Sequence, residues 1–157
     1  MEKVEETIEG FQRVRVVGVF MSPVPEGVTP VVFLENDRDE VLPIYIGAAE
    51  AFSIQTALEK VPYPRPLTHD LLVNILEGLN SKIERVLIDD LSDGVFFARL
   101  IVRVNGNEFE FDARPSDSIA LAVRTGAPVY VSDRVMESAS VSKDEYRISF
   151  EEGEGEE

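Results

Sequence analysis

The chain has 157 residues, of which 44% are hydrophobic, and this length supports one well-packed core without calling for a second domain. It contains no cysteine, which excludes disulfides, thiolate metal ligands and a cysteine nucleophile. The formal net charge of −15 argues against a broad positive face for long duplex nucleic acid, but it leaves room for a small site that binds one or a few phosphates.

Much of the negative charge lies at the two ends of the chain. Residues 1–9 hold four glutamates against one lysine, and residues 151–157 hold five glutamates. We therefore predict an N-terminal extension over residues 1–12 and an acidic tail over residues 139–157 that is partly disordered. The chain begins without the basic and apolar regions of a signal peptide, and no apolar run is long enough to cross a bilayer. We expect a soluble cytoplasmic protein that does not bind membranes.

The first part of the chain is predicted to form strands. β-branched residues predict a strand over residues 13–20, and three prolines with a glycine predict a loop over residues 22–30. Apolar residues 31–34 and 41–46 flank a polar turn, which is typical of a hairpin. Pro43 has no N–H to donate to a sheet, so we expect it at an edge of the sheet or at a bulge.

Two predicted helices follow, separated by a stiff connector. The apolar spacing of residues 48–60 favours a helix over a strand. Alternating prolines exclude a helix from residues 61–66, because proline lacks an N–H and its preceding residue avoids helical geometry. Thr68 is then expected to cap a helix that runs from His69 to about residue 79.

The second half of the chain predicts an antiparallel meander whose three strands cover residues 83–91, 95–104 and 108–112. The pair Asn105-Gly106 is a strong signal for the second hairpin of this meander. A helix over residues 116–124 ends at Gly126, and residues 128–132 form a short strand.

The order of these elements defines the expected fold class. Strands, two helices, more strands, a helix and a last strand indicate a single compact α+β domain. We place this domain over residues 13–138, with a mostly antiparallel mixed sheet and about three helices.

Two short segments resemble one another and suggest where the chemistry lies. Arg65-Pro66-Leu67-Thr68-His69-Asp70 and Arg114-Pro115-Ser116-Asp117 each lead into a predicted helix. A helix start has unpaired N–H groups and a partial positive charge, so an arginine beside it makes a good anion site. If the two segments converge, they bring together four candidate phosphate-binding residues: Arg65, Thr68, Arg114 and Ser116.

The acidic residues and the single histidine are the candidate catalytic groups. His69 in the first turn of a helix is a reasonable general base or ligand, with Asp70 and Asp117 beside it. Asp70, Asp117 and Glu50 could together hold Mg²⁺ or Mn²⁺, which prefer oxygen ligands. No motif for an organic cofactor is present.

Simpler interpretations of the same residues stay open. His69 could be a surface residue without a role, and Asp70, Asp117 and Glu50 could each only complement the dipole of a helix start. Arg65 and Arg114 could each form an ion pair with the aspartate of the other segment, which would make a structural clasp.

Several motifs together resemble the bifunctional nuclease domain family. They are, in chain order, Leu42-Pro43-Ile44-Tyr45-Ile46-Gly47 with Glu50, Arg65-Pro66-Leu67-Thr68-His69-Asp70-Leu71, Arg114-Pro115-Ser116-Asp117-Ser118-Ile119-Ala120-Leu121-Ala122 and Thr125-Gly126-Ala127-Pro128. The resemblance covers residues 13–138 and leaves the acidic tail outside. It implies a compact α+β domain, which in plants belongs to a nuclease that acts on both RNA and DNA.

These observations lead to two hypotheses for function. The first is a nuclease that hydrolyses phosphodiester bonds in single-stranded or short nucleic acid, RNA or DNA, with the help of a divalent metal. The second is a non-catalytic binding or regulatory module for a small anionic ligand, or else an oligomeric structural protein. Apolar strand signals and the edge at Pro43 lead us to expect a homodimer.

Overall fold

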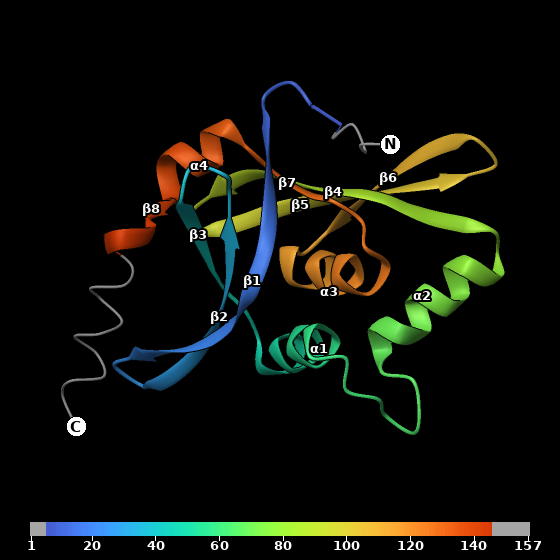
Figure 1. Cartoon of the computed structure of the whole chain (residues 1–157), viewed down its shortest axis with the longest axis horizontal. Helices are drawn as coiled ribbons and strands as arrows, with labels where there is room; N and C mark the ends of the chain where they lie inside the picture. Colours follow the sequence, from blue (N-terminus) through green and yellow to red (C-terminus); the bar gives the residue numbers. More distant parts are fainter. Residues whose placement is uncertain (1–5, 146–157) are drawn as a thin grey trace.

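The structure is a computed structural model of the chain, and it describes residues 6–145. Its regular elements are, in chain order, β1 (Phe11–Val24), β2 (Gly27–Glu35), β3 (Glu40–Tyr45), α1 (Ala48–Leu58), α2 (Thr68–Gly78), β4 (Ser81–Ser92), β5 (Val95–Val104), β6 (Asn107–Ala113), α3 (Pro115–Thr125), β7 (Val129–Ser132), α4 (Asp133–Ala139) and β8 (Val141–Ser142). The strands form one sheet in the order β6-β5-β4-β7-β1-β2-β3-β8 (Figure 1). Among the described strands only β4 and β7 pair in parallel, so the predicted α+β domain with a mostly antiparallel mixed sheet is confirmed.

The long strand β1 joins two halves of the sheet. Its first residues, Phe11–Val14, pair with β7, and the rest of the strand, from Arg15 onward, pairs with β2. A register shift between Val16 and Gly18 marks a bulge, which increases the local twist. The two halves therefore turn around the helices instead of continuing as one flat layer (Figure 1).

Helix α3 lies at the centre of the molecule, between the two halves of the sheet and against α1 and α2 (Figure 1). Seven of its eleven residues are buried, from Pro115 to Ala122 with Asp117 excepted. Small side chains at Ser118, Ala120 and Ala122 let neighbouring elements approach closely, which suits a helix packed on several sides. The helix ends at Gly126 with φ of 78°, a left-handed conformation that glycine adopts without strain, as predicted.

The predicted loop over residues 22–30 is wrong, because these residues extend the β1–β2 hairpin. Val24 pairs with Gly27 across a two-residue turn, and Met21 pairs with Pro30. Within the described residues, this end of the hairpin pairs with no third strand. A missing N–H is tolerated at such a free edge, so prolines do not prevent a strand here.

Pro43 lies at an edge of the sheet, as one of the two predicted arrangements has it. It pairs with Phe33 of β2 on one side, while β8 contacts β3 only at Glu40 and Val41. The ladder of β3 therefore needs no donor from Pro43 on its outer side.

Two helix starts differ from the predictions. Leu67, not Thr68, is the N-cap of α2, and Thr68 is the first helical residue. Helix α4 was not expected; it begins after Ser132, whose hydroxyl accepts from the N–H of Val135. The predicted C-terminal tail is described only as far as residue 145. No helix among the described residues is long and apolar enough to span a membrane.

Candidate functional site

A cleft of about 760 Å³ lies between α1, α2, the start of α3 and the strands β5 and β6. Apolar side chains form most of its wall, among them Phe52, Leu72, Ile75, Leu76, Phe111 and Leu121. Five polar residues gather at one part of the wall: Glu50, Ser53, His69, Arg114 and Asp117. Three of these, His69, Arg114 and Asp117, belong to the two Arg-Pro segments. The segments therefore do converge here.

His69 is held on both ring nitrogens. It is the second residue of α2 and is buried, with 7% of its surface exposed. Its Nε2 lies 2.9 Å from Oδ1 of Asp117, and its Nδ1 lies 2.6 Å from Oγ of Ser53. An ionised carboxylate only accepts hydrogen bonds, so Asp117 places the ring hydrogen on Nε2. Nδ1 is then the acceptor, and the Ser53 hydroxyl donates to it.

Arg114 connects the two carboxylates at this end of the cleft. It is the N-cap of α3, and its Nε donates to Oδ2 of Asp117 at 2.8 Å while its Nη2 donates to Oε1 of Glu50 at 2.9 Å. The contacts form a polar chain that runs from Ser53 through His69, Asp117 and Arg114 to Glu50. This polar chain links α1, α2 and α3 through side chains alone.

The charges of the polar chain are fixed by its hydrogen bonds. Burial alone would raise the pKa of Asp117, but hydrogen bonds from Arg114 and His69 outweigh it and hold the pKa below its ordinary value. Asp117, and to a smaller extent Glu50, raise the pKa of the Arg114 guanidinium. Asp117 is therefore ionised at neutral pH beside a permanent cation.

Asp70 faces away from the cleft and serves a different contact. Its Oδ1 accepts from Nε of Arg124 at 2.7 Å, and its Oδ2 accepts from the N–H of Leu67 at 2.9 Å. Arg124 lies in the last turn of α3, is largely buried and also donates to the carbonyl of Ala120. The Arg124 guanidinium lowers the pKa of Asp70 despite the opposing effect of burial. This pair is a clasp between α2 and α3, although its arginine is not one of the two predicted for a clasp.

The remaining predicted residues are only partly in the cleft. Thr68 lines it and is exposed. Ser116 is buried and lines a smaller hollow next to Tyr45 and Phe96. Arg65 lies in the exposed connector before α2, does not line the cleft, and has no hydrogen bond or ion pair with any residue from 6 to 145.

A larger hollow of about 980 Å³ lies on another side, between β1, the β2–β3 turn and the ends of α1 and α3. Two of its charged residues pair with each other, because Arg15 donates to Glu35, and Arg38 lies 3.7 Å from Glu40, which is outside the lining. It contains none of the predicted site residues. We therefore assign the candidate site to the smaller cleft.

Residues 31–144 match the bifunctional nuclease domain, and every residue of the polar chain lies in this range. The chain belongs to this family. An uncharacterised protein of Mycobacterium tuberculosis is 40% identical over 128 residues, which are 82% of this chain and 76% of that protein. The resemblance of the sequence motifs to the family is thus confirmed.

Two plant proteins of the family are more distant. Bifunctional nuclease 1 of Oryza sativa subsp. indica is 28% identical over 105 residues, which are 65% of this chain and 32% of the plant protein. Bifunctional nuclease 1 of Arabidopsis thaliana is 27% identical over 120 residues, which are 69% and 37% of the two chains. This chain therefore spans about a third of the length of these plant nucleases.

The predicted metal ligands of this bifunctional nuclease domain are not gathered around one point. Across residues 6–145, no group of three or more histidine, aspartate or glutamate side chains is arranged to hold a metal ion. Arg114 lies between Glu50 and Asp117, and Asp70 is paired with Arg124. As arranged, the three carboxylates do not fit the predicted Mg²⁺ or Mn²⁺ site, because Arg114 separates Glu50 from Asp117 and Arg124 occupies Asp70.

Two important residues of this bifunctional nuclease domain escaped prediction from the sequence. Ser53 lies three residues after Glu50, so both are on one face of α1, and this spacing is the signal that could have revealed it. Arg124 gave no local signal, since its partner Asp70 lies on another helix.

Proposed function

We propose that the cleft binds single-stranded or short nucleic acid and hydrolyses its phosphodiester bonds. The observation that carries this proposal is the polar chain at one part of an apolar cleft, in a member of the bifunctional nuclease domain family. It supplies a cation for the phosphate and a histidine oriented by a carboxylate.

Arg114 is the residue proposed to bind the phosphate. Two thirds of its side chain is exposed, and its Nη1 has no hydrogen-bond partner among the described residues. Asp117 and Glu50 hold the other nitrogens, so the guanidinium is oriented before a ligand arrives. A fixed guanidinium at a helix start is well suited to a phosphate oxygen.

His69 is the proposed general base, and its acceptor atom is Nδ1. The water or hydroxyl that attacks phosphorus would give its proton to Nδ1, the nitrogen that the Ser53 hydroxyl now contacts. Asp117 would stabilise the resulting imidazolium through Nε2. The protonated ring can then return the proton to the leaving oxygen.

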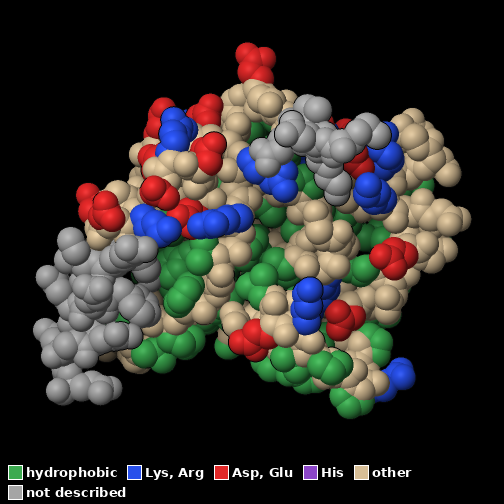
Figure 2. Space-filling view, viewed as in Figure 1, with side chains coloured by type: hydrophobic (Ala, Val, Ile, Leu, Met, Phe, Trp, Pro, Cys, Tyr) green, Lys and Arg blue, Asp and Glu red, His purple; other side chains and the backbone are tan. Residues whose placement is uncertain are grey.

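The apolar wall supports a substrate with accessible bases. Phe52 and Phe111 line the cleft, and each is about half exposed. Aromatic rings stack on unpaired bases, whose faces are hidden in a duplex. On the face seen in Figure 2, Lys and Arg side chains lie among Asp and Glu and form no broad basic patch, which argues against long duplex as the substrate.

Cleavage of labelled single-stranded RNA, single-stranded DNA and duplex tests the proposal, with Mg²⁺, Mn²⁺ or EDTA in parallel. We expect single strands to be cut, and His69→Ala and Asp117→Asn to lose at least about a hundredfold in rate, the usual contribution of general base catalysis. Asp70→Asn is the matched control, because it changes an aspartate at the same helical position outside the cleft. Equal cleavage by all variants would show that the activity comes from a contaminant.

The alternative is a regulatory module that binds a small anion in the same cleft. The observation in its favour is that both carboxylates of the polar chain already have partners within the chain. Such a module would gain thermal stability from a mononucleotide or inorganic phosphate and return it unchanged. Its Arg114→Ala variant would lose this stabilisation, while no variant would affect nucleic-acid cleavage.

A further inference from the structure

An apolar surface extends beyond the cleft toward one edge of the sheet. It consists of Leu72 and Ile75 of α2 and Leu79, the C-cap of that helix, with Phe109 and Phe111 of β6, and we call it the α2–β6 face. All five side chains are exposed, from 41% at Leu72 to 67% at Leu79. Leu72, Ile75 and Phe111 line the same cleft, so the helix and the strand form one continuous surface. A connected apolar surface of this kind usually marks a binding partner.

The strand in this surface is an edge of the sheet, and its outer side pairs with no other described strand. β6 pairs with β5 on one side and is the last strand of the sheet (Figure 1). Asn105 and Gly106 have φ of 50° and 82°, which fits a two-residue type I′ turn. Such a turn is closed by a hydrogen-bonded pair, here Val104 with Asn107. The alternation of an antiparallel ladder then directs the N–H and C=O groups of Glu108, Glu110 and Asp112 outward.

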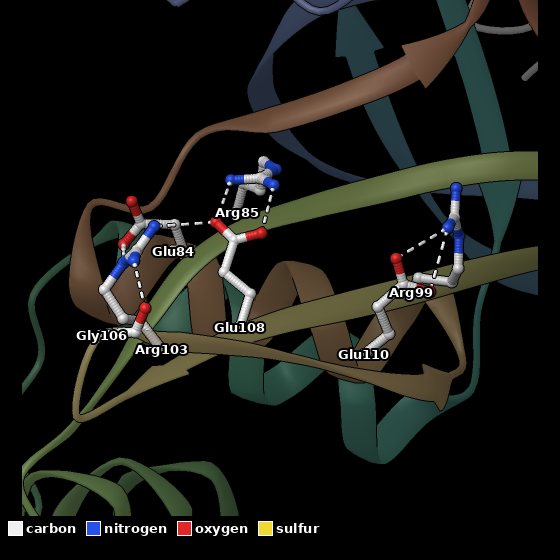
Figure 3. A network of polar contacts seen from close by, with 7 residues as sticks. All are labelled: Glu84, Arg85, Arg99, Arg103, Gly106, Glu108 and Glu110. Atoms are coloured by element: carbon white, nitrogen blue, oxygen red, sulfur yellow. Dashed lines mark hydrogen bonds and ion pairs between the residues drawn. The ribbon is translucent and has the colours of Figure 1, made fainter.

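Two of the acidic residues on this edge, Glu108 and Glu110, are paired with arginines of the same chain (Figure 3). Arg85 donates to both oxygens of Glu108 at 3.1 and 2.9 Å, and Arg103 donates to the same carboxylate at 2.8 Å. Arg99 donates to Glu110 at 3.2 Å. Charges on an edge strand normally repel a second strand. Here the internal pairs reduce that repulsion at Glu108 and Glu110.

We propose that two copies of this chain form a dimer by pairing their β6 strands antiparallel, with Glu110 opposite Glu110 of the second copy. This register follows from the outward residues, since only they can exchange hydrogen bonds across the edge. It also places Phe109 of each copy opposite Phe111 of the other. These are non-hydrogen-bonded pairs, at which side chains of two antiparallel strands come closest. A shift of two residues in either direction leaves only one Phe–Phe pair.

The dimer would complete the cleft and cover the α2–β6 face. Phe109 of the second copy would lie beside Phe111, and so would extend the apolar wall that Phe111 forms. The two α2 helices lie on the same side of the joined sheet, where Leu72, Ile75 and Leu79 can cover the junction. The contact is isologous, so it closes after two copies and does not propagate into a fibre. This inference does not depend on the proposed activity.

The absence of cysteine allows a direct test of the register by Glu110→Cys. In the proposed pair the two Cα atoms lie about 5.5 Å apart, within the range of a disulfide. We expect mild oxidation to give a covalent dimer of Glu110→Cys, and no covalent dimer of Glu108→Cys alone. A mixture of Glu108→Cys and Asp112→Cys should cross-link. Cross-linking of an exposed control, Val28→Cys, to the same extent as Glu110→Cys would overturn the register.

Sedimentation equilibrium tests the interface without a cross-link. We expect a dimer, and Leu79→Glu or Glu110→Pro should raise its dissociation constant about tenfold or more, equivalent to at least about 1.4 kcal/mol. Proline at position 110 removes only an outward N–H, which an edge strand tolerates. Glu110→Ala controls for the lost contact with Arg99, and Val28→Glu controls for a charge on another exposed apolar site.

Two results would overturn the proposal. One is a monomer at the highest attainable concentration. The other is a dimer whose dissociation constant changes in neither Leu79→Glu nor Glu110→Pro. If Leu79→Glu instead weakens binding of a labelled single-stranded oligonucleotide to a monomer, the α2–β6 face binds nucleic acid and not a second copy.

Discussion

The starts of α2 and α3 carry similar sequences, yet they serve different purposes. Asp70 and Asp117 both stand three residues after the N-cap of their helix. Asp117 faces the cleft and contacts His69 and Arg114, whereas Asp70 faces the other side and contacts Arg124. A shared motif therefore predicts a shared backbone geometry but not a shared environment.

The two arginines explain the difference further. Arg114 is itself the N-cap of α3, while Arg65 precedes the N-cap of α2 by two residues. Leu67 occupies the position in α2 that Arg114 occupies in α3. This offset puts Arg65 on the exposed connector and leaves the clasp of α2 to an arginine from the far end of α3.

The largest expected effect is the difference in activity between the alanine variants of the two arginines. We expect Arg114→Ala to lower kcat/KM for single-stranded substrate about a hundredfold, because a charge-assisted contact to the phosphate is lost. Arg65→Ala should leave both kcat/KM and the free energy of unfolding unchanged within about 0.5 kcal/mol. Steady-state kinetics and urea unfolding of the two variants check this, and an equal loss of activity in both would return Arg65 to the site.

A smaller effect is the difference between the ion pairs of Arg124 and Arg114 in their contribution to the free energy of unfolding. We expect Arg124→Ala to lower the free energy of unfolding by about 2 kcal/mol, since it removes a largely buried guanidinium and leaves a carboxylate without its partner. Arg114→Ala should cost less than about 1 kcal/mol, because its side chain is mostly exposed. Urea unfolding at neutral pH measures both. The reverse order would make Arg114 the structural clasp.

The smallest effect concerns pH. Arg124 lowers the pKa of Asp70, and hydrogen bonds that outweigh burial lower that of Asp117, so folding favours both ionised forms. Their contribution to stability is present above the ordinary aspartate pKa of about 3.9 and is lost as pH falls through the lowered values. We therefore expect Asp70→Asn to unfold with a weaker dependence on pH between about pH 5 and pH 2 than the unaltered chain. Unfolding curves across this range check it; an unchanged slope would mean that Asp70 is not paired in solution.

Local signals in the sequence were enough for most of the fold. Asn105-Gly106 fixed one hairpin, and Gly126 fixed the end of α3, because each signal acts within a few residues. The prolines of residues 22–30 indicate a loop where the structure has a hairpin, because their effect on a strand depends on whether a third strand lies alongside. That information is not local.

The candidate site, like the fold, was predictable from the sequence only where local signals decide it. His69, Asp117, Arg114 and Glu50 do meet, and sequence reasoning could state this as a condition on how the segments converge. It could not choose the partner of Asp70, because that depends on which side of α2 packs against α3. The role of each residue in catalysis stays a prediction.

The position of β7 has a consequence for how the molecule assembles. β7 lies between β4 and β1 in the middle of the sheet. Its Ser132 pairs with Phe11 of β1, so residues from near the two ends of the described chain lie side by side. Closing the long loop between Phe11 and Ser132 costs chain entropy before the contacts between β1 and β7 can form. We therefore expect the meander of β4, β5 and β6 to form early, and the half of the sheet that carries α1 to join it late. Glu50 and Ser53 would reach the cleft only in that last step. A partly folded chain would therefore have the apolar wall of β5 and β6 without the complete polar chain, and ligand binding there would report on complete folding.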